Sequence, residues 1–598
     1  MAVVDTNNAA DEAAQDALTP PIESRDSRLA TSLRSGMPTG EFWRWALAAA
    51  LMPLAVYIVA RPDWYYELNG LDSYFYTGYA QNFSDVLEMN GGIHYFVSRW
   101  TLYLPNHLLF RLFGAPEGFL VLRWLSASLV TGCIIALGRR RWRTADIVAL
   151  CLFVLISPMF LRTVMTDYAD SVTIPLGILA IAVVALHPTS TWSAVVAGLC
   201  GAGIAIGNPL AASVVICLIP AWLWVIGTWK RRLMLMSIAL ASGAFVLALG
   251  WGLFRFRYGI PNVYAPTIDF MRSNAGLQDG LKSPRLWWMG YRIWIYLPLI
   301  VIVAWRYLVK VKHVTFDFSE TVVLTTCAFQ YAFQIWYQFS RHGSTLEIPY
   351  YWSLMVPALL LGTVVVVGKL AQRCREWLLP AVVGMILLTV LLFRDRFPEL
   401  YSSWLDAAVV VSILAVAWHR FGDRFPGLPA CSVIALSFTF QIGAPRSEPL
   451  LPGESKVDVS YEATFDPAGS DGIDGYEAAT WFADYMNQLE IGDERASYFL
   501  IGGGNAHPMA AMYNAHVTGR WLNAGWGENS PGPNFSRDGA WAVATGIVSV
   551  ITMVGTVEDL EAMTSALTKI QPNFTVLLEG TAPDRFETRI MVVRIDPS

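Results

Sequence analysis

The chain has 598 residues, of which 55% are hydrophobic and only 15% are charged, and its mean hydropathy is +0.43. Soluble domains carry about 25% charged residues, so this composition excludes an ordinary water-soluble enzyme. The chain has 47 acidic and 42 basic residues. The segment from Gly443 to Ser598 contains 21 of the acidic and 9 of the basic residues, so the preceding part of the chain is basic. Because phosphate binding needs a basic face, the acidic tail argues against a nucleic acid partner.

The first 40 residues are rich in Ala, Asp, Glu, Thr and Pro and contain no apolar core of their own. Such a segment cannot bury enough apolar surface to fold, and it does not resemble a cleaved signal peptide. Residues 1–40 are therefore predicted to form a disordered cytoplasmic extension.

Residues 41–445 contain apolar runs of roughly 15 to 22 residues separated by short charged loops, a pattern typical of a polytopic α-helical membrane protein. About 13 transmembrane helices are expected. They are predicted to begin near Trp43, Gly118, Ile147, Val172, Trp192, Pro209, Leu233, Ile293, Thr321, Tyr350, Trp377, Trp404 and Leu428.

Basic clusters indicate the orientation in an inner (plasma) membrane. Clusters follow even-numbered spans at Arg139–Arg143, Lys230–Arg232, Lys310–Lys312 and Arg373–Arg375. By the positive-inside rule these loops are cytoplasmic, as is the N-terminus. An odd number of spans then places the acidic tail outside the membrane.

The first predicted outer loop, residues 61–117, is too long for a simple turn, and loops of this length are usually functional. Its aromatic residues alternate with acids between Asp63 and Asp85, a composition suited to the interface between lipid and water.

The tail, residues 446–598, changes its hydrophobic period. Short apolar runs at Ser497–Ile501, Val548–Met553, Phe574–Leu578 and Thr588–Ile595 predict strands, and Val557–Lys569 has a helical pattern. These elements predict a small extracytoplasmic α/β domain.

Three carboxylates are candidates for catalysis. Asp72 follows the Asn69-Gly70 turn and precedes Ser73-Tyr74, so it could act as a general base among aromatic groups, with Tyr74 in the same pocket. Asp167 and Asp170 are three residues apart and would face one side of a helix, where they could converge with Asp72 on a site or a divalent cation. Helix capping and solvated surface acids are the alternatives.

Several bases on predicted outer segments break the positive-inside pattern. A lipid-linked phosphate would explain them, because guanidinium groups bind phosphate oxygens in pairs; anionic headgroups are the alternative. The selected phosphate-binding residues are Arg99, Arg255, Arg257, Arg285 and Arg341. His342 and Glu347 could join the polar pocket or a metal site, although no second histidine supports a metal.

These features resemble the GT-C superfamily of integral membrane glycosyltransferases, within it the protein O-mannosyltransferases and aminoarabinose transferases. The resemblance rests on Leu71–Tyr74, on Tyr95 with Arg99–Pro105, on Thr166–Asp170 and on the outer tail. It implies that Asp72 matches the first-loop acid of the family, that Asp167 or Asp170 matches the second-loop acid, and that the donor is a polyprenyl-phosphate sugar. The family often has an acidic pair in the first loop, whereas Ser73 follows Asp72 here.

The resulting hypothesis is a glycosyltransferase that moves a sugar from a polyprenyl phosphate to a hydroxyl of an envelope glycan, lipid or protein outside the membrane. The configuration at the anomeric carbon of the sugar is expected to invert. A divalent cation is the one cofactor that the sequence suggests. One rival is a transporter or flippase for lipid-linked saccharides, which predicts ionisable residues within spans; Arg123 and Asp406 are the obvious ones. The other rival is a non-catalytic scaffold for envelope assembly.

Overall fold

The computed structural model describes most of the predicted membrane region and part of the tail. The described residues are 39–60, 76, 79–80, 83, 96–139, 141–156, 164, 170–226, 228–273, 293–340, 353–373, 481, 497–501, 521–523, 550–583 and 587–595.

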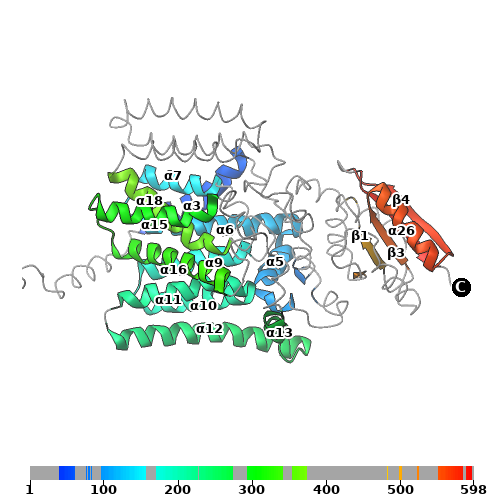
Figure 1. The fold of residues 1–598 in the computed structure, drawn as a ribbon, viewed down its shortest axis with the longest axis horizontal. Coiled ribbons are helices and arrows are strands. Elements are labelled where there is room, and N and C mark those ends of the chain that lie inside the picture. Colours follow the sequence, from blue (N-terminus) through cyan, green and yellow to red (C-terminus); the bar gives the residue numbers. More distant parts are fainter. Residues whose placement is uncertain are drawn as a thin grey trace, which may run out of the picture. The chain divides into compact units, whose positions relative to one another are not determined.

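Helices dominate the described part of the chain before residue 374, and Figure 1 shows those of the bundle running side by side along one direction. In chain order they are α3 (Thr39–Ala60), η1 (Val97–Arg99), α5 (Trp100–Phe113), α6 (Ala115–Gly138), α7 (Thr144–Ile156), α9 (Asp170–Leu186), α10 (Thr191–Gly207), η2 (Pro209–Ala212), α11 (Ser213–Val225), α12 (Trp229–Tyr258), α13 (Ala265–Ser273), α15 (Ile293–Lys310), α16 (Phe318–Ser340), η4 (Ser353–Met355) and α18 (Val356–Arg373).

The described helices agree with the prediction of a polytopic helical membrane protein, because each of the first ten predicted spans coincides with one of them. By length and composition, two described helices can cross a membrane, Glu117–Gly138 and Trp229–Tyr258. Shorter apolar helices follow at Ser171–Leu186, Thr191–Gly207, Pro209–Trp224 and Val356–Lys369. The spans predicted near Trp377, Trp404 and Leu428 lie outside the described residues, so the total of 13 stays a prediction.

Helices α9 and α16 lie at the centre of the bundle. Helix α9 packs against α6, α10, α16 and α18, and α16 packs against α11, α15 and α18. Gly177 of α9 lies so close to Pro357 and Val214 that a Cβ atom there would be 3.0 Å from the Pro357 ring. A larger side chain at this position would push α9 away from the first turns of α11 and α18.

Two of the three described 3₁₀ segments, η2 and η4, lie within the bundle. Asn208 ends the α-helical run before η2, and its side-chain oxygen accepts a hydrogen bond of 3.2 Å from the Leu210 amide. Segment η4 directly precedes α18, and its Leu354 shares a buried apolar cluster with Ile204 and with Ala211 of η2. The two 3₁₀ segments therefore meet inside the bundle.

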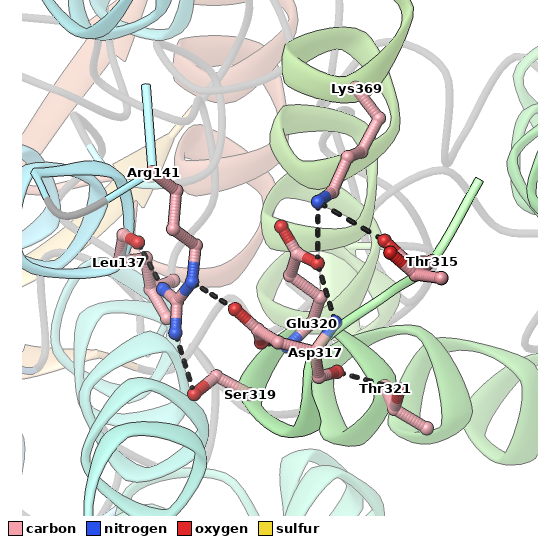
Figure 2. A network of polar contacts seen from close by, with 8 residues as sticks. All are labelled: Leu137, Arg141, Thr315, Asp317, Ser319, Glu320, Thr321 and Lys369. Atoms are coloured by element: carbon pink, nitrogen blue, oxygen red, sulfur yellow. Dashed lines mark hydrogen bonds and ion pairs between the residues drawn. The ribbon is translucent and has the colours of Figure 1, made fainter. Parts of the chain in front are cut away.

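At one end of the bundle, which we call the basic end, basic residues lie in the loop after α6 (Arg139, Arg141 and Arg143), in the first turn of α12 (Lys230–Arg232) and at the end of α15 (Lys310 and Lys312). A polar network connects the loop after α6 with the start of α16 and the end of α18 (Figure 2). Arg141 forms an ion pair with Asp317 and donates a 3.0 Å hydrogen bond to the Ser319 hydroxyl.

The second half of this network is buried. The Lys369 ammonium lies 3.0 Å from a carboxylate oxygen of Glu320, whose side chain is only 2% exposed (Figure 2). Asp317 and Glu320 also accept hydrogen bonds from each other's backbone amides, at 3.0 and 2.9 Å, and thereby cap the first turn of α16. These contacts fix three chain segments to one another at the basic end.

The described part of the tail contains a five-stranded sheet in the order β2-β1-β3-β5-β4. Its elements are β1 (Ser497–Ile501), β2 (Trp521–Asn523), β3 (Val550–Gly555), α26 (Val557–Ile570), β4 (Phe574–Thr581) and β5 (Arg589–Ile595). Strands β1, β2 and β3 are parallel, whereas β5 pairs antiparallel with β3 and β4.

Helix α26 starts at a capping box between Thr556 and Asp559 and packs Leu560, Met563 and Leu567 on the sheet. The predicted strands and the predicted helix of this region agree with the structure, and β2 is an addition to them. The expected boundary at residue 446 and the outer location of this part stay predictions.

Candidate functional site

Aromatic residues from distant parts of the chain form one buried cluster at the end of the bundle opposite the basic end. We call it the first-loop cluster, because most of its members come from the predicted loop 61–117. Its buried members are Tyr76, Tyr79, Ala80, Phe83, Phe96, Val97, Leu102, Tyr103, Phe110, Phe119, Phe254, Ile260 and Val263.

Helix α5 supplies one side of this cluster, although the sequence predicted only a loop there. Its buried residues Leu102, Tyr103, Asn106 and Phe110 follow helical spacing. Leu104, Leu108 and Leu112 on other faces of the helix are exposed, as expected for a helix in contact with lipid.

The end of α12 supplies the other side of the cluster. Gly259 adopts a left-handed conformation (φ 69°) that ends α12, and the Ile260 amide then bonds back to the Phe254 carbonyl at 3.2 Å. Gly250 lies against Trp100 and the Tyr264 hydroxyl, where a Cβ atom would clash. The close approach of α12 to the first-loop cluster therefore depends on these two glycines.

Arg99 lies inside the first-loop cluster and is only 6% exposed. Its guanidinium group donates a 2.6 Å hydrogen bond to the Tyr76 hydroxyl and lies 5.9 Å from the centre of the Tyr76 ring. An arginine keeps its positive charge, and in a region of low dielectric constant that charge acts strongly on neighbouring groups. Arg99 therefore places a cation inside the first-loop cluster.

Two phenols near Arg99 stay neutral. Burial raises the pKa of Tyr103 well above 10.0, with smaller contributions from Tyr79 and other phenols, and burial also raises the pKa of Tyr264. The Tyr103 hydroxyl donates to the Val97 carbonyl at 2.7 Å, and that of Tyr264 donates to the Leu247 carbonyl at 2.9 Å. Both phenols position the backbone and add no negative charge.

Arg255 and Arg257 differ from Arg99 because both are exposed, on the last turn of α12. The Arg255 guanidinium lies 5.2 Å from the Trp251 ring centre, and that of Arg257 lies 5.7 Å from the Tyr258 ring centre. Tyr258 itself packs against the first-loop cluster. The structure therefore brings these two arginines near the cluster, on its accessible side.

The start of α9 also reaches the first-loop cluster. Asp170 is the first residue of α9, and Val172 packs against the cluster. The Ser126 hydroxyl of α6 donates a 3.3 Å hydrogen bond to the Ser171 carbonyl. The backbone of Asp170 is thus two residues from a cluster contact, and the orientation of its side chain lies outside what the structure describes.

A second buried arginine borders the cluster. Arg123 of α6 is 1% exposed, and its guanidinium lies 5.7 Å from the ring centre of Phe119, a cluster member. In the sequence, Arg123 is recognisable only as a charge within a predicted span. Its burial beside the cluster depends on contacts between distant segments, so the pattern of the sequence could not indicate it.

Other predicted site residues lie outside the described residues, and their roles stay predictions: Asp72, Tyr74, Asp167, Arg285, Arg341, His342 and Glu347. Among the residues that the structure does describe, no group of three or more His, Cys, Asp or Glu side chains could hold a metal ion.

The chain has the same fold as two crystal structures of ArnT, a GT-C aminoarabinose transferase, from Cupriavidus metallidurans. The structure bound to undecaprenyl phosphate has a TM-score of 0.52 at 13% identity, covering 94% of this chain and 99% of that chain. The apo structure has a TM-score of 0.53 at 14% identity, covering 92% of this chain and 98% of that chain.

No protein-family model matches the sequence, and no curated protein matches it either. At 13 to 14% identity, the two ArnT structures demonstrate a common fold and leave the reaction to be argued from the residues of this chain.

Proposed function

We propose that the protein transfers a sugar from a polyprenyl-phosphate donor to a hydroxyl of an envelope glycan, lipid or protein at the outer face of the membrane. The observation that carries this proposal is Arg99, a buried cation in an aromatic cluster that also contacts the end of α12 and the start of α9. One of the two structures of similar fold was determined with undecaprenyl phosphate bound, which supports a donor of this class.

The donor carries negative charge on its phosphate, and that charge increases when the sugar leaves. In this proposal Arg99 stabilises the leaving phosphate inside the cluster, where low dielectric strengthens the attraction. Arg255 and Arg257, being exposed on the last turn of α12, attract the phosphate from the lipid headgroup region. Arg285 and Arg341 remain further candidates for the same task.

Asp72 is proposed as the general base. It removes the proton of the acceptor hydroxyl while the oxygen attacks the anomeric carbon, the bond from that carbon to the phosphate oxygen breaks, and the configuration inverts. A base in this position contributes about 10²- to 10⁴-fold to the rate. We also propose that the same pocket is lined by Asp167, Asp170, Tyr74, His342 and Glu347. A divalent cation could bind among these side chains.

The experiment is a transfer assay with purified protein in detergent, a panel of radiolabelled polyprenyl-phosphate sugars and an envelope extract as acceptor. Wild type should move one label to the extract, and Asp72→Asn should lower the rate by at least 10²-fold without loss of donor binding. Asp269→Asn on exposed α13 is the matched control and should keep full activity.

Two results would contradict the proposal. Near-normal transfer by Asp72→Asn would remove the base assignment. Movement of an intact labelled donor across vesicle membranes, without cleavage of the sugar–phosphate bond, would favour the flippase instead.

A further inference from the structure

Two glutamines of α16 bury their amide groups in the middle of the bundle. Gln330 is fully buried and Gln334 is 2% exposed. They are four residues apart and so face the same side of α16. Gln334 lies six residues before the end of α16 at Ser340, a distance of about 9 Å along the helix.

Within the described residues, the amide nitrogens of both glutamines have partners, whereas their amide oxygens have none. Gln330 donates to the Leu354 carbonyl of η4, and Gln334 donates to the Ser213 hydroxyl at the start of α11, at 3.4 Å. Within the described part of the structure, the side-chain oxygens of both glutamines are buried and accept no hydrogen bond. An unsatisfied buried acceptor costs about 1–3 kcal/mol, so this pair needs an explanation.

The backbone beside these glutamines is 3₁₀-helical and not α-helical. Segments η2 and η4 meet there, through Ala211 and Leu354. Irregular backbone at membrane depth is tolerated where it is buried in protein or lines a cavity, and interrupted helices commonly form substrate sites in membrane proteins. Short 3₁₀ segments have weaker hydrogen bonds than α-helices, which makes this junction easier to separate than a contact between regular α-helices.

The chemistry of the junction selects its ligand. Amide oxygens repel a phosphate, and a buried ammonium group without a carboxylate would lose too much hydration energy. A neutral hydroxyl, in contrast, donates one hydrogen bond to such an oxygen and can accept another from the Ser213 hydroxyl.

The junction is also close to the proposed transfer site. Gly177 of α9 contacts Pro357 and Val214, the neighbours of η4 and of Ser213, and it follows Asp170 by seven residues, about 10 Å along the helix.

We propose that the junction of η2, η4 and α16 binds hydroxyl groups of the sugar carried by the donor, through the side-chain oxygens of Gln330 and Gln334. This inference rests on the proposed transferase function. Gln330 and Gln334 then determine which sugar is accepted, because a site built to receive hydroxyls rejects an analogue that lacks them.

The test measures thermal unfolding of the full-length protein in detergent with citronellyl phosphate or with its mannosyl, glucosyl and arabinosyl esters, beside the transfer assay. Wild type should be stabilised more by at least one sugar ester than by citronellyl phosphate itself. Gln330→Met and Gln334→Met should lose this difference and lower transfer about tenfold or more, while their unliganded unfolding temperature stays equal or rises.

Thr363→Val is the matched control, because the Thr363 hydroxyl of α18 is likewise buried without a hydrogen bond in the described structure. It should keep both the sugar-dependent stabilisation and transfer. Suppose that the wild-type protein transfers sugar and that both glutamine variants behave like Thr363→Val. This result would overturn the proposed hydroxyl site and leave the proposed function intact. No transfer and no stabilisation of wild type by any of the compounds would overturn both this inference and the proposed function.

Discussion

The described contacts of the cationic side chains differ between the two ends of the bundle. At the basic end, Arg141 and Lys369 each lie against a carboxylate, Asp317 and Glu320 (Figure 2). At the first-loop end, Arg99 and Arg255 lie over aromatic rings. At the basic end the ion pairs join separate chain segments, whereas at the first-loop end aromatic rings position the guanidinium groups. The comparison indicates that the basic end holds the helices together and that the first-loop end gathers the cations to which the proposed function assigns the donor phosphate.

The largest effect is expected from Lys369→Met at the basic end. It leaves the buried Glu320 carboxylate without its cation, which should lower the free energy of unfolding by about 3–5 kcal/mol. The measurement is thermal unfolding in detergent. Lys312→Met, an exposed base at the same end, is the control and should change little. The double variant Lys369→Met/Glu320→Met should recover much of the loss; if it does not, the ion pair is not the cause.

An intermediate effect is expected at Arg99. Arg99→Met removes the hydrogen bond to Tyr76 and the contact with its ring, which should lower the free energy of unfolding by about 2 kcal/mol. It should also abolish stabilisation by citronellyl phosphate. Tyr76→Phe removes the same hydrogen bond and keeps the cation, so phosphate should still stabilise it. Equal loss of phosphate binding in both variants would assign Arg99 a structural role only.

The smallest effect on folding is expected at the end of α12. Arg255→Gln should alter the free energy of unfolding by less than about 0.5 kcal/mol, because the side chain is exposed. If Arg255 attracts the donor, KM should rise several-fold at low salt with unchanged kcat, and the difference should shrink as salt increases. Lys230→Gln, at an exposed residue of the other end of α12, is the control and should leave KM unchanged. A salt-independent change would argue against electrostatic attraction.

Much of the fold could be predicted from the sequence. Apolar length and period are local properties, so the positions of α6, α9, α10 and α16 and of the described strands except β2 followed from short stretches of residues. Helix α5 was missed because its aromatic and basic residues resemble those of an interfacial loop, and its buried face forms only when α6, α10 and the other members of the first-loop cluster pack against it.

The site was less predictable. Arg99 and Arg255 look alike in the sequence, yet one is buried and the other is exposed, because burial is decided by contacts between segments about 150 residues apart. Gln330 and Gln334 gave no signal at all, since a neutral amide within an apolar run barely changes its hydropathy. Asp72 and Asp167 lie outside the described residues and stay predictions.

The length of helix α12 can be compared with the thickness of the membrane. The apolar stretch between its two groups of bases runs from Leu233 to Phe254, about 33 Å at 1.5 Å per residue, close to the hydrocarbon thickness of about 30 Å. In a thicker bilayer, Arg255 or Arg232 would be drawn toward the acyl chains, and in a thinner one the helix would have to tilt. Catalysis in reconstituted vesicles should therefore depend on acyl-chain length, with an optimum where both groups of bases reach the headgroups.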